Sequence, residues 1–198
     1  MSKNKFKFSK KTLTLLRAIH VYVSMALLMM MIFFAITGIT LNHPQWFDGD
    51  GVSHTAQVSL PSYLTALSTT ERAQALPHYV ASQFAMDFSN ADISEEEISI
   101  VQKGPGTYKS LLIDLVEGES YFESIEYGFV AILNDLHKGR NSGLVWSWVL
   151  DISAILMLLF SITGALLLIP QQRRMKKSLF YMSVATCSCV AIFFIFTP

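Results

Sequence analysis

The sequence predicts an integral membrane α-helical protein with three transmembrane helices and a small α+β domain between the first two. The main observation is the absence of charged side chains from residues 18–41, 152–169 and 178–196. Each stretch is close to the roughly 20 residues that a helix needs to cross the hydrocarbon core of a bilayer. The segment between the first two stretches has the mixed composition of a soluble protein, so we expect it to fold outside the bilayer.

The uneven distribution of charge predicts the orientation in the membrane. Residues 1–17 and 170–177 carry lysines and arginines but no acidic side chain, and all acidic residues except Asp151 lie between the first two spans. Positively charged flanks stay in the cytoplasm. We therefore expect both basic segments to lie inside the cell, with residues 42–143 and the C-terminus outside.

The expected order of segments follows from these boundaries. It comprises a basic cytoplasmic N-terminus (1–17), a first span (18–41), an outer α+β domain (42–127), an interfacial amphipathic helix with a bend (128–143), a second span (144–169), a basic cytoplasmic linker (170–177) and a third span (178–196).

The outer domain is predicted to be a helix packed on an antiparallel meander. Residues 61–84 have a helical pattern, with Thr69 or Thr70 as the cap and Pro77 as a break or bend. The domain shows no nucleophile–base pair, no phosphate-binding loop and no cluster of metal ligands, so no catalytic residue is predicted there. Three strand-like runs follow the helix, at residues 97–102, 108–116 and 121–127.

Three histidines lie near the ends of the expected spans. His20 is at the cytoplasmic start of the first span, and His43 ends this span on the outer side, where Pro44 disfavours helical geometry. His137 lies in the amphipathic segment that leads into the second span. We expect His43 and His137 to approach the same outer face and His20 to be alone at the inner face.

Imidazoles that converge from different helices can bind haem b, because its iron takes one axial nitrogen on each side of the porphyrin. Glycines such as Gly38 and Gly164 leave room for a ring, and Arg17 and Arg140, each three residues from a candidate histidine, can pair with propionates. The alternative is that the histidines cap helix ends at the interface. Each Thr-Gly pair is then a small-residue packing notch between helices.

One sequence motif occurs twice in the chain, once near the end of each of the first two spans. FAITGITLNHP at residues 34–44 and FSITGALLLIP at residues 160–170 share the pattern F-x-I-T-G-x-x-L-x-x-P. Because the first span is expected to run outward and the second inward, the two copies form an inverted pair. Their Thr-Gly pairs are then expected near opposite surfaces of the membrane, and His43 belongs to the first copy only.

Two segments resemble the PepSY-associated transmembrane proteins. RAIHVYVSMALLMMMIFFAITGITLNHP (17–44) resembles their first membrane helix, and LNDLHKGRNSGLVWSWVLDISAILMLLFSITGALLL (133–168) resembles their second signature. The helix and meander between them are similar to a PepSY module. The resemblance implies a bacterial inner-membrane protein whose larger relatives are haem-containing reductases, some of them for ferric siderophores. It places the family's histidines at His20 and His137, and it does not extend to His43.

These observations predict a haem b-binding electron-transfer subunit of a membrane redox or ferric-reductase-like system. The haem iron would be bound by His137 with His43 at the outer face. His20 would serve an inner haem if a homodimer or a redox partner subunit supplies the second ligand. The chain has the short three-span form without a flavin or nicotinamide domain, so a complete enzyme is not expected, nor is a nucleic-acid partner. The alternative is a non-redox, membrane-anchored PepSY module that binds or regulates a periplasmic partner or peptidase.

Overall fold

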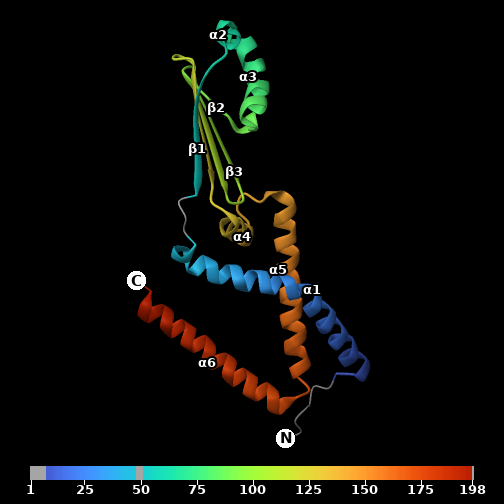
Figure 1. Cartoon of the computed structure of the whole chain (residues 1–198). Helices are drawn as coiled ribbons and strands as arrows, with labels where there is room; N and C mark the ends of the chain where they lie inside the picture. Colours follow the sequence, from blue (N-terminus) through green and yellow to red (C-terminus); the bar gives the residue numbers. More distant parts are fainter. Residues whose placement is uncertain (1–7, 48–50, 198) are drawn as a thin grey trace. The chain divides into compact units, whose positions relative to one another are not determined.

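The computed structural model describes residues 8–47 and 51–197 (Figure 1). They divide into two compact units, Met1–Ile32 with Leu150–Pro198 and Phe33–Val149, which are described separately. The elements are the α-helices α1 (Lys10–Asn42), α2 (Ser62–Ala66), α3 (Thr69–Phe84), α4 (Phe129–Lys138), α5 (Gly143–Leu168) and α6 (Gln172–Phe196), the 3-10 helices η1 (Pro44–Trp46) and η2 (Phe88–Asn90), and the strands β1 (Val52–Ser59), β2 (Asp92–Ile93), β3 (Glu97–Gly104), β4 (Thr107–Asp114) and β5 (Glu119–Glu126).

Three long apolar helices confirm that this is a membrane protein in contact with the lipid bilayer. α1, α5 and α6 contain 33, 26 and 25 residues, and their most apolar windows have mean hydropathies of 2.3, 2.2 and 2.2. A helix of 25 residues is about 37 Å long, which exceeds the hydrocarbon thickness. The three predicted spans are therefore confirmed by length and composition.

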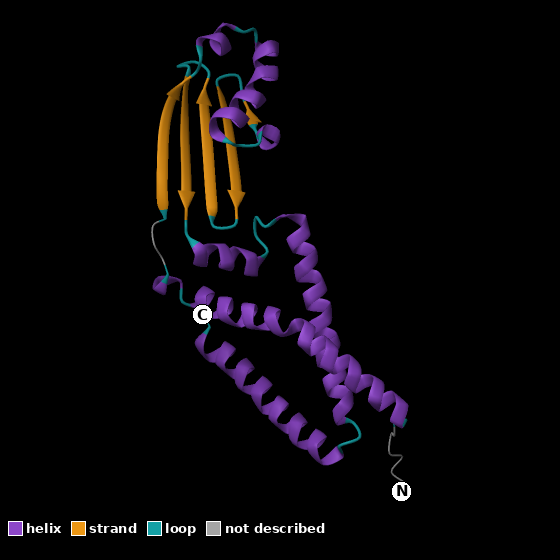
Figure 2. Cartoon of the chain, turned by 45° about the vertical axis from the view of Figure 1, so that its right-hand side comes forward, coloured by secondary structure: helices purple, strands orange, loops and turns teal. Residues whose placement is uncertain are grey.

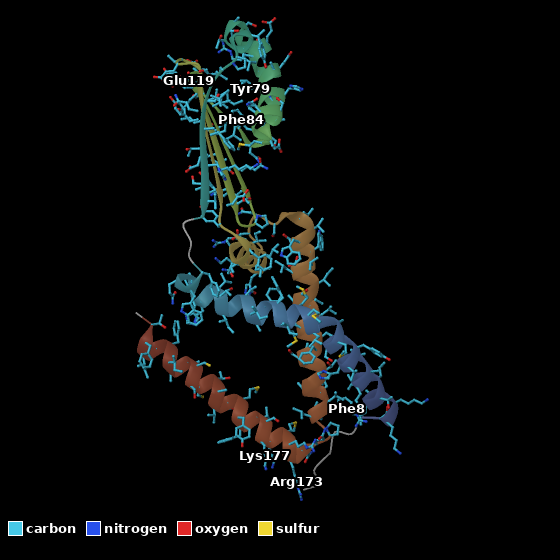
Figure 3. The ribbon with its side chains drawn as sticks, in the orientation of Figure 1. Phe8, Tyr79, Phe84, Glu119, Arg173 and Lys177 are labelled. Carbon is cyan, nitrogen blue, oxygen red and sulfur yellow. The ribbon has the colours of Figure 1, made fainter. Side chains whose placement is uncertain are left out.

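All three of these helices begin before their charge-free stretches, and α5 does so at Gly143. α1 begins at Lys10, and α6 begins at Gln172. Lysine and arginine are good helix formers, so the loss of charge along the sequence does not mark the start of the helix. Figure 3 shows Arg173 and Lys177 on the first turns of α6.

The second unit contains a five-stranded antiparallel sheet with the order β1-β5-β4-β3-β2 (Figure 2). Its central hairpins, β3–β4 and β4–β5, confirm the predicted meander. The edge strands β1 and β2 were not predicted. β1 pairs along its whole length with β5, from Val52 opposite Glu126 to Ser59 opposite Glu119.

The hydrophobic core of this unit lies between α3 and one face of the sheet. Leu76 and Val80 of α3 pack in a single cluster with Ile100, Leu111 and Ile113 of the central strands, and none of these side chains is more than 2% exposed. Full burial of one such side chain contributes about 1.5–3 kcal/mol. This cluster gives the sheet one covered face.

The start of α3 differs from the prediction. Its N-cap is Ser68, which forms a capping box with Glu71, so the prediction of Thr69 or Thr70 is wrong. The sequence Ser-x-x-Glu favours this start because the two residues satisfy each other's backbone groups. Hydrogen bonds from the Ser68 hydroxyl and backbone hold the pKa of the Glu71 carboxyl below its usual value. α3 also continues through Pro77 to Phe84, so the proline does not end the helix.

Candidate functional site

In the first unit, the imidazole of His20 lies in the Thr-Gly notch of α5. Its Nδ1 is 3.0 Å from Thr163 Oγ1 and 3.2 Å from the carbonyl oxygen of Phe160. The ring also stacks on the Phe160 ring, with 4.6 Å between centroids and 13° between planes. A Cβ added to Gly164 would lie 3.1 Å from His20 Cε1, so the missing side chain is what admits the imidazole.

In the second unit, the imidazole of His137 lies in the equivalent notch of α1. His137 Nδ1 forms a hydrogen bond with Thr37 Oγ1. The Phe34 ring meets the imidazole edge to face, with 4.9 Å between centroids. A Cβ added to Gly38 would lie 3.9 Å from His137 Cε1, which is an ordinary contact distance.

The repeated sequence motif therefore forms the same kind of contact with a histidine twice. In each copy the phenylalanine packs against an imidazole, the threonine binds its Nδ1 and the glycine faces its Cε1. The histidine comes from a different helix in each case, 143 residues away from Thr163 and 100 residues away from Thr37 in the sequence. Sequence reasoning identified the repeated threonines and glycines and placed His20 near Thr163 and Gly164, but it did not predict the contact of His137 with Thr37 and Gly38.

The oxygen atoms around each imidazole favour a proton on Nδ1. The Thr37 hydroxyl donates its one hydrogen to the Phe33 carbonyl at 2.6 Å, so its oxygen is left to accept from His137 Nδ1–H. In the other notch the Thr163 hydroxyl donates to the Leu159 carbonyl at 2.8 Å. A neutral imidazole that is protonated at Nδ1 carries its lone pair on Nε2. Among the described residues neither Nε2 has a hydrogen-bond partner, so this nitrogen is available as an acceptor when Nδ1 carries the proton.

His43 has different neighbours. α1 ends at Asn42, as Pro44 predicted, and His43 has non-helical backbone angles. Its ring stacks on the indole of Trp46, with 4.0 Å between centroids and 5° between planes. Within the described residues, His43 stacks on Trp46 whereas His137 packs against Phe33 and Phe34. The pairing of His43 with His137 stays a prediction.

The two arginines lie beside the notches with exposed side chains. Arg17 is on α1, one turn before His20. Arg140 follows the left-handed Gly139 that ends α4, and its backbone N–H donates to the Asp135 carbonyl at 3.1 Å. Both side chains are exposed, and each lies three residues along the sequence from its histidine.

Further polar contacts fix the helix that carries His137, and sequence reasoning missed them. The Thr40 hydroxyl donates to Asn134 Oδ1 at 2.6 Å, and the Trp146 indole N–H donates to the Leu136 carbonyl at 2.8 Å. The spacing of Asn134 and His137, one helical turn apart on α4, was the available signal for a shared contact face.

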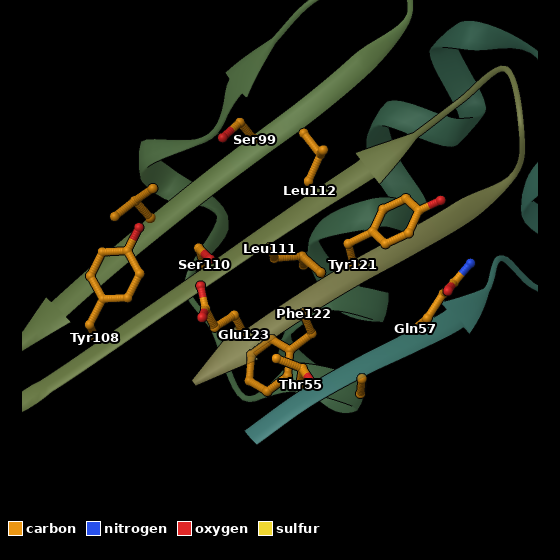
Figure 4. Close-up of a pocket in the computed structure, with 12 residues that line it drawn as sticks. Thr55, Gln57, Ser99, Tyr108, Ser110, Leu111, Leu112, Tyr121, Phe122 and Glu123 are labelled. Carbon is orange, nitrogen blue, oxygen red and sulfur yellow. The ribbon is translucent and has the colours of Figure 1, made fainter. Parts of the chain in front are cut away.

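The face of the sheet opposite α3 contains an open pocket of about 620 Å³ (Figure 4). Partial burial, and then the Glu117 carboxylate, raise the pKa of the Tyr121 hydroxyl above its usual value. The pocket combines aromatic, aliphatic and hydroxyl side chains. Its labelled lining residues are Thr55, Gln57, Ser99, Tyr108, Ser110, Leu111, Leu112, Tyr121, Phe122 and Glu123.

The described part of the chain contains no group of three or more His, Cys, Asp or Glu side chains that could hold a metal ion alone. His20 is the one histidine in the sequence of its unit. A second histidine ligand at this imidazole would therefore have to come from outside the unit.

The chain is a small membrane protein with three apolar helices, an α+β domain and two Thr-Gly notches that each hold a histidine. The chain belongs to the PepSY_TM-like family, whose model matches residues 14–198. No curated protein and no solved structure matches it.

Proposed function

We propose that this protein is a haem b-binding electron-transfer subunit of a bacterial inner-membrane redox system. The observation that carries the proposal is the contact of Nδ1 of His20 and of His137 with a threonine hydroxyl, which favours a proton on Nδ1. Haem-ligating histidines use one ring nitrogen for iron and commonly donate the other N–H to an oxygen acceptor. The two notches supply this donor arrangement without a rearrangement of the imidazole.

The residues fit haem b in donor chemistry, since each notch would supply one imidazole nitrogen to the iron of its own haem. Haem b, when bound, supplies reversible one-electron transfer. The chain's own contribution is to hold Nε2 as the free nitrogen and to surround the ring with Phe160 in one notch and Phe34 in the other. The second axial ligand would be His43 for His137, and a residue of a second copy or a redox partner subunit for His20.

The proposed orientation follows from charge. The basic segments 1–17 and 170–177 would face the cytoplasm, and the sheet domain would face the periplasm. His137 would then serve the periplasmic side and His20 the cytoplasmic side. Arg140 and Arg17 would pair with propionates near each surface, because a guanidinium binds a carboxylate in bidentate geometry.

A difference spectrum tests the proposal. The full chain is produced in haem-replete cells, purified in detergent and measured as reduced minus oxidised. We expect sharp b-type bands that decrease in His137→Ala and in His20→Ala but not in His78→Ala, which removes an exposed histidine of α3. His43→Ala decides whether this residue is the second outer ligand. A colourless wild-type preparation would overturn the proposal.

The Thr37→Val variant tests the role of the threonine. Valine keeps the shape of threonine but removes the acceptor of the His137 Nδ1–H. Loss of such a partner typically weakens the metal site by about 10- to 100-fold. We therefore expect Thr37→Val to lose haem from its outer site at a smaller dilution of the detergent-solubilised protein than wild type does.

The second candidate is a non-redox PepSY module that binds a periplasmic partner or peptidase. The pocket on the open face of the sheet favours it, because Leu112 and Tyr121 are 37% and 39% exposed there although both are large. Exposed apolar surface of this kind often marks a binding site. A photo-crosslinking residue at Leu112 should then capture one defined partner, whereas one at the exposed turn residue Val116 should not.

A further inference from the structure

α4 contacts a different element on each of two sides. On one side, Asn134 and His137 contact α1. On the other side, Ile132 and Asp135 contact the turn between β3 and β4. The ten residues of α4 therefore lie between the membrane helix and the sheet domain of the same unit.

The turn between β3 and β4 is held directly against α4. Gly106 N–H donates to Asp135 Oδ2 at 2.8 Å, and the Gly106 carbonyl accepts from Tyr127 N–H at 2.9 Å. A Cβ added to Gly106 would lie 2.5 Å from Ile132 Cγ1 and 3.0 Å from the Ile132 backbone nitrogen. The turn can approach the helix this closely only because residue 106 has no side chain.

α4 depends on such contacts for its position. Helices of this length are marginal in isolation, so tertiary contacts decide where they lie. Its N-cap is Gly128, which has no side chain to cap the first turn, and none of its residues is fully buried. The last turn is fixed by the Trp146 indole bound to the Leu136 carbonyl. The first turns are fixed by the β3–β4 turn.

We propose that Asp135 is a positioning residue for His137. By accepting the Gly106 N–H, Asp135 fixes α4 to the sheet domain and keeps the His137 imidazole seated against Thr37. The sheet domain thereby controls the orientation of this imidazole and the nitrogen that it leaves free. The proposal deepens the proposed function, in which His137 is a haem ligand, but its physical claim concerns the imidazole alone.

The role of Asp135 rests on its acceptor oxygen and not on its charge. Asparagine keeps an oxygen at the same place and can still accept the Gly106 N–H. Leucine has a similar volume but leaves that N–H without a partner. The two variants therefore separate hydrogen bonding from packing.

Nitrogen NMR of the full chain, labelled with ¹⁵N-histidine in detergent micelles without haem, tests this inference. The His137 signals are assigned by their loss in His137→Ala. We expect two well-separated ring-nitrogen signals, typical of one neutral tautomer, in wild type and Asp135→Asn. In Asp135→Leu we expect these signals to collapse toward an exchange average, while the His20 signals stay unchanged.

Glycine variants provide the matched control. Gly106 and Gly118 both lie in β-hairpin turns with φ of +64° and +71°, so alanine strains both turns equally. Only Gly106→Ala collides with α4, because an added Cβ at Gly118 meets nothing closer than Thr65 Cγ2 at 3.8 Å. Gly106→Ala should change the His137 signals, and Gly118→Ala should not. Adding Ile132→Ala to Gly106→Ala removes the shorter clash and should partly restore the wild-type signals.

These variants separate the possible outcomes. Unchanged His137 signals in both Asp135→Leu and Gly106→Ala would overturn the inference, whether or not the protein binds haem. If Asp135→Leu does not fold, the comparison of Gly106→Ala with Gly118→Ala decides alone. A colourless protein in which the His137 signals respond as described would refute haem binding but support the positioning role.

Discussion

An added Cβ has more room at Gly38 than at Gly164. Substitution by alanine should therefore have opposite effects on stability at these two glycines. In a helix interior, alanine is favoured over glycine by about 1 kcal/mol. At Gly38 the added Cβ would make an ordinary contact of 3.9 Å, so Gly38→Ala should keep most of this gain. At Gly164 the Cβ would lie 3.1 Å from His20 Cε1, which requires a shift of a few tenths of an ångström.

His20 has little freedom to make that shift. Its ring is stacked on Phe160 and its Nδ1 is bound to Thr163, so movement away from Gly164 disturbs both contacts. Overpacking of this kind costs roughly 1–3 kcal/mol. After subtraction of the helix-propensity gain, Gly164→Ala should lose about 0–2 kcal/mol, which leaves the two variants about 1–3 kcal/mol apart.

Thermal unfolding of the full chain in detergent, at one fixed scan rate and followed by circular dichroism, measures this difference. For a chain of this size, 1 kcal/mol corresponds to a shift of roughly 2–4 °C in the midpoint. The midpoint should rise in Gly38→Ala and stay level or fall in Gly164→Ala. Equal midpoints, together with unchanged ¹⁵N signals of His20 in Gly164→Ala, would refute the assignment of Gly164 as the residue that admits the imidazole.

Three further predictions concern the sheet domain. Ser68→Ala removes the cap of α3 and should destabilise the domain by about 1 kcal/mol in urea denaturation. Glu71 and Asp87 have lowered pKa values in the folded state, the first through Ser68 and the second through the backbone and hydroxyl of Ser89. Their stabilisation is present above the usual carboxyl pKa of about 4 and is lost as the pH falls through the lower folded values, so denaturation midpoints should decrease below about pH 4. Tyr79→Phe deletes a buried hydroxyl that has no hydrogen-bond partner among the described residues, so the domain should keep or gain stability in the same assay.

The membrane helices and the central hairpins could be predicted because their signals are local. Charge-free stretches mark the spans, and strand-like runs separated by turn residues mark β3 to β5. β1 gave no such signal, since seven of its eight residues are exposed and the other is partly buried. Its strand conformation depends on pairing with β5, which starts 60 residues after β1 ends.

The notches could be predicted only in part for the same reason. The repeated Thr-Gly pairs were visible in the sequence, but each histidine partner is at least 100 residues away. No local pattern links His137 to Thr37 or Asp135 to Gly106. These contacts depend on where α4 lies against α1 and the β3–β4 turn, and only the folded chain specifies that.

The position of β1 at the edge of the sheet has a practical consequence for work with the isolated domain. One side of this strand pairs with β5, and its eight residues, VSHTAQVS, include no charged side chain and no proline. Such residues normally prevent an edge strand from pairing with a strand of another molecule. A concentrated preparation of the domain is therefore expected to associate edge to edge, and a lysine in place of Thr55 or Gln57 should keep it monomeric.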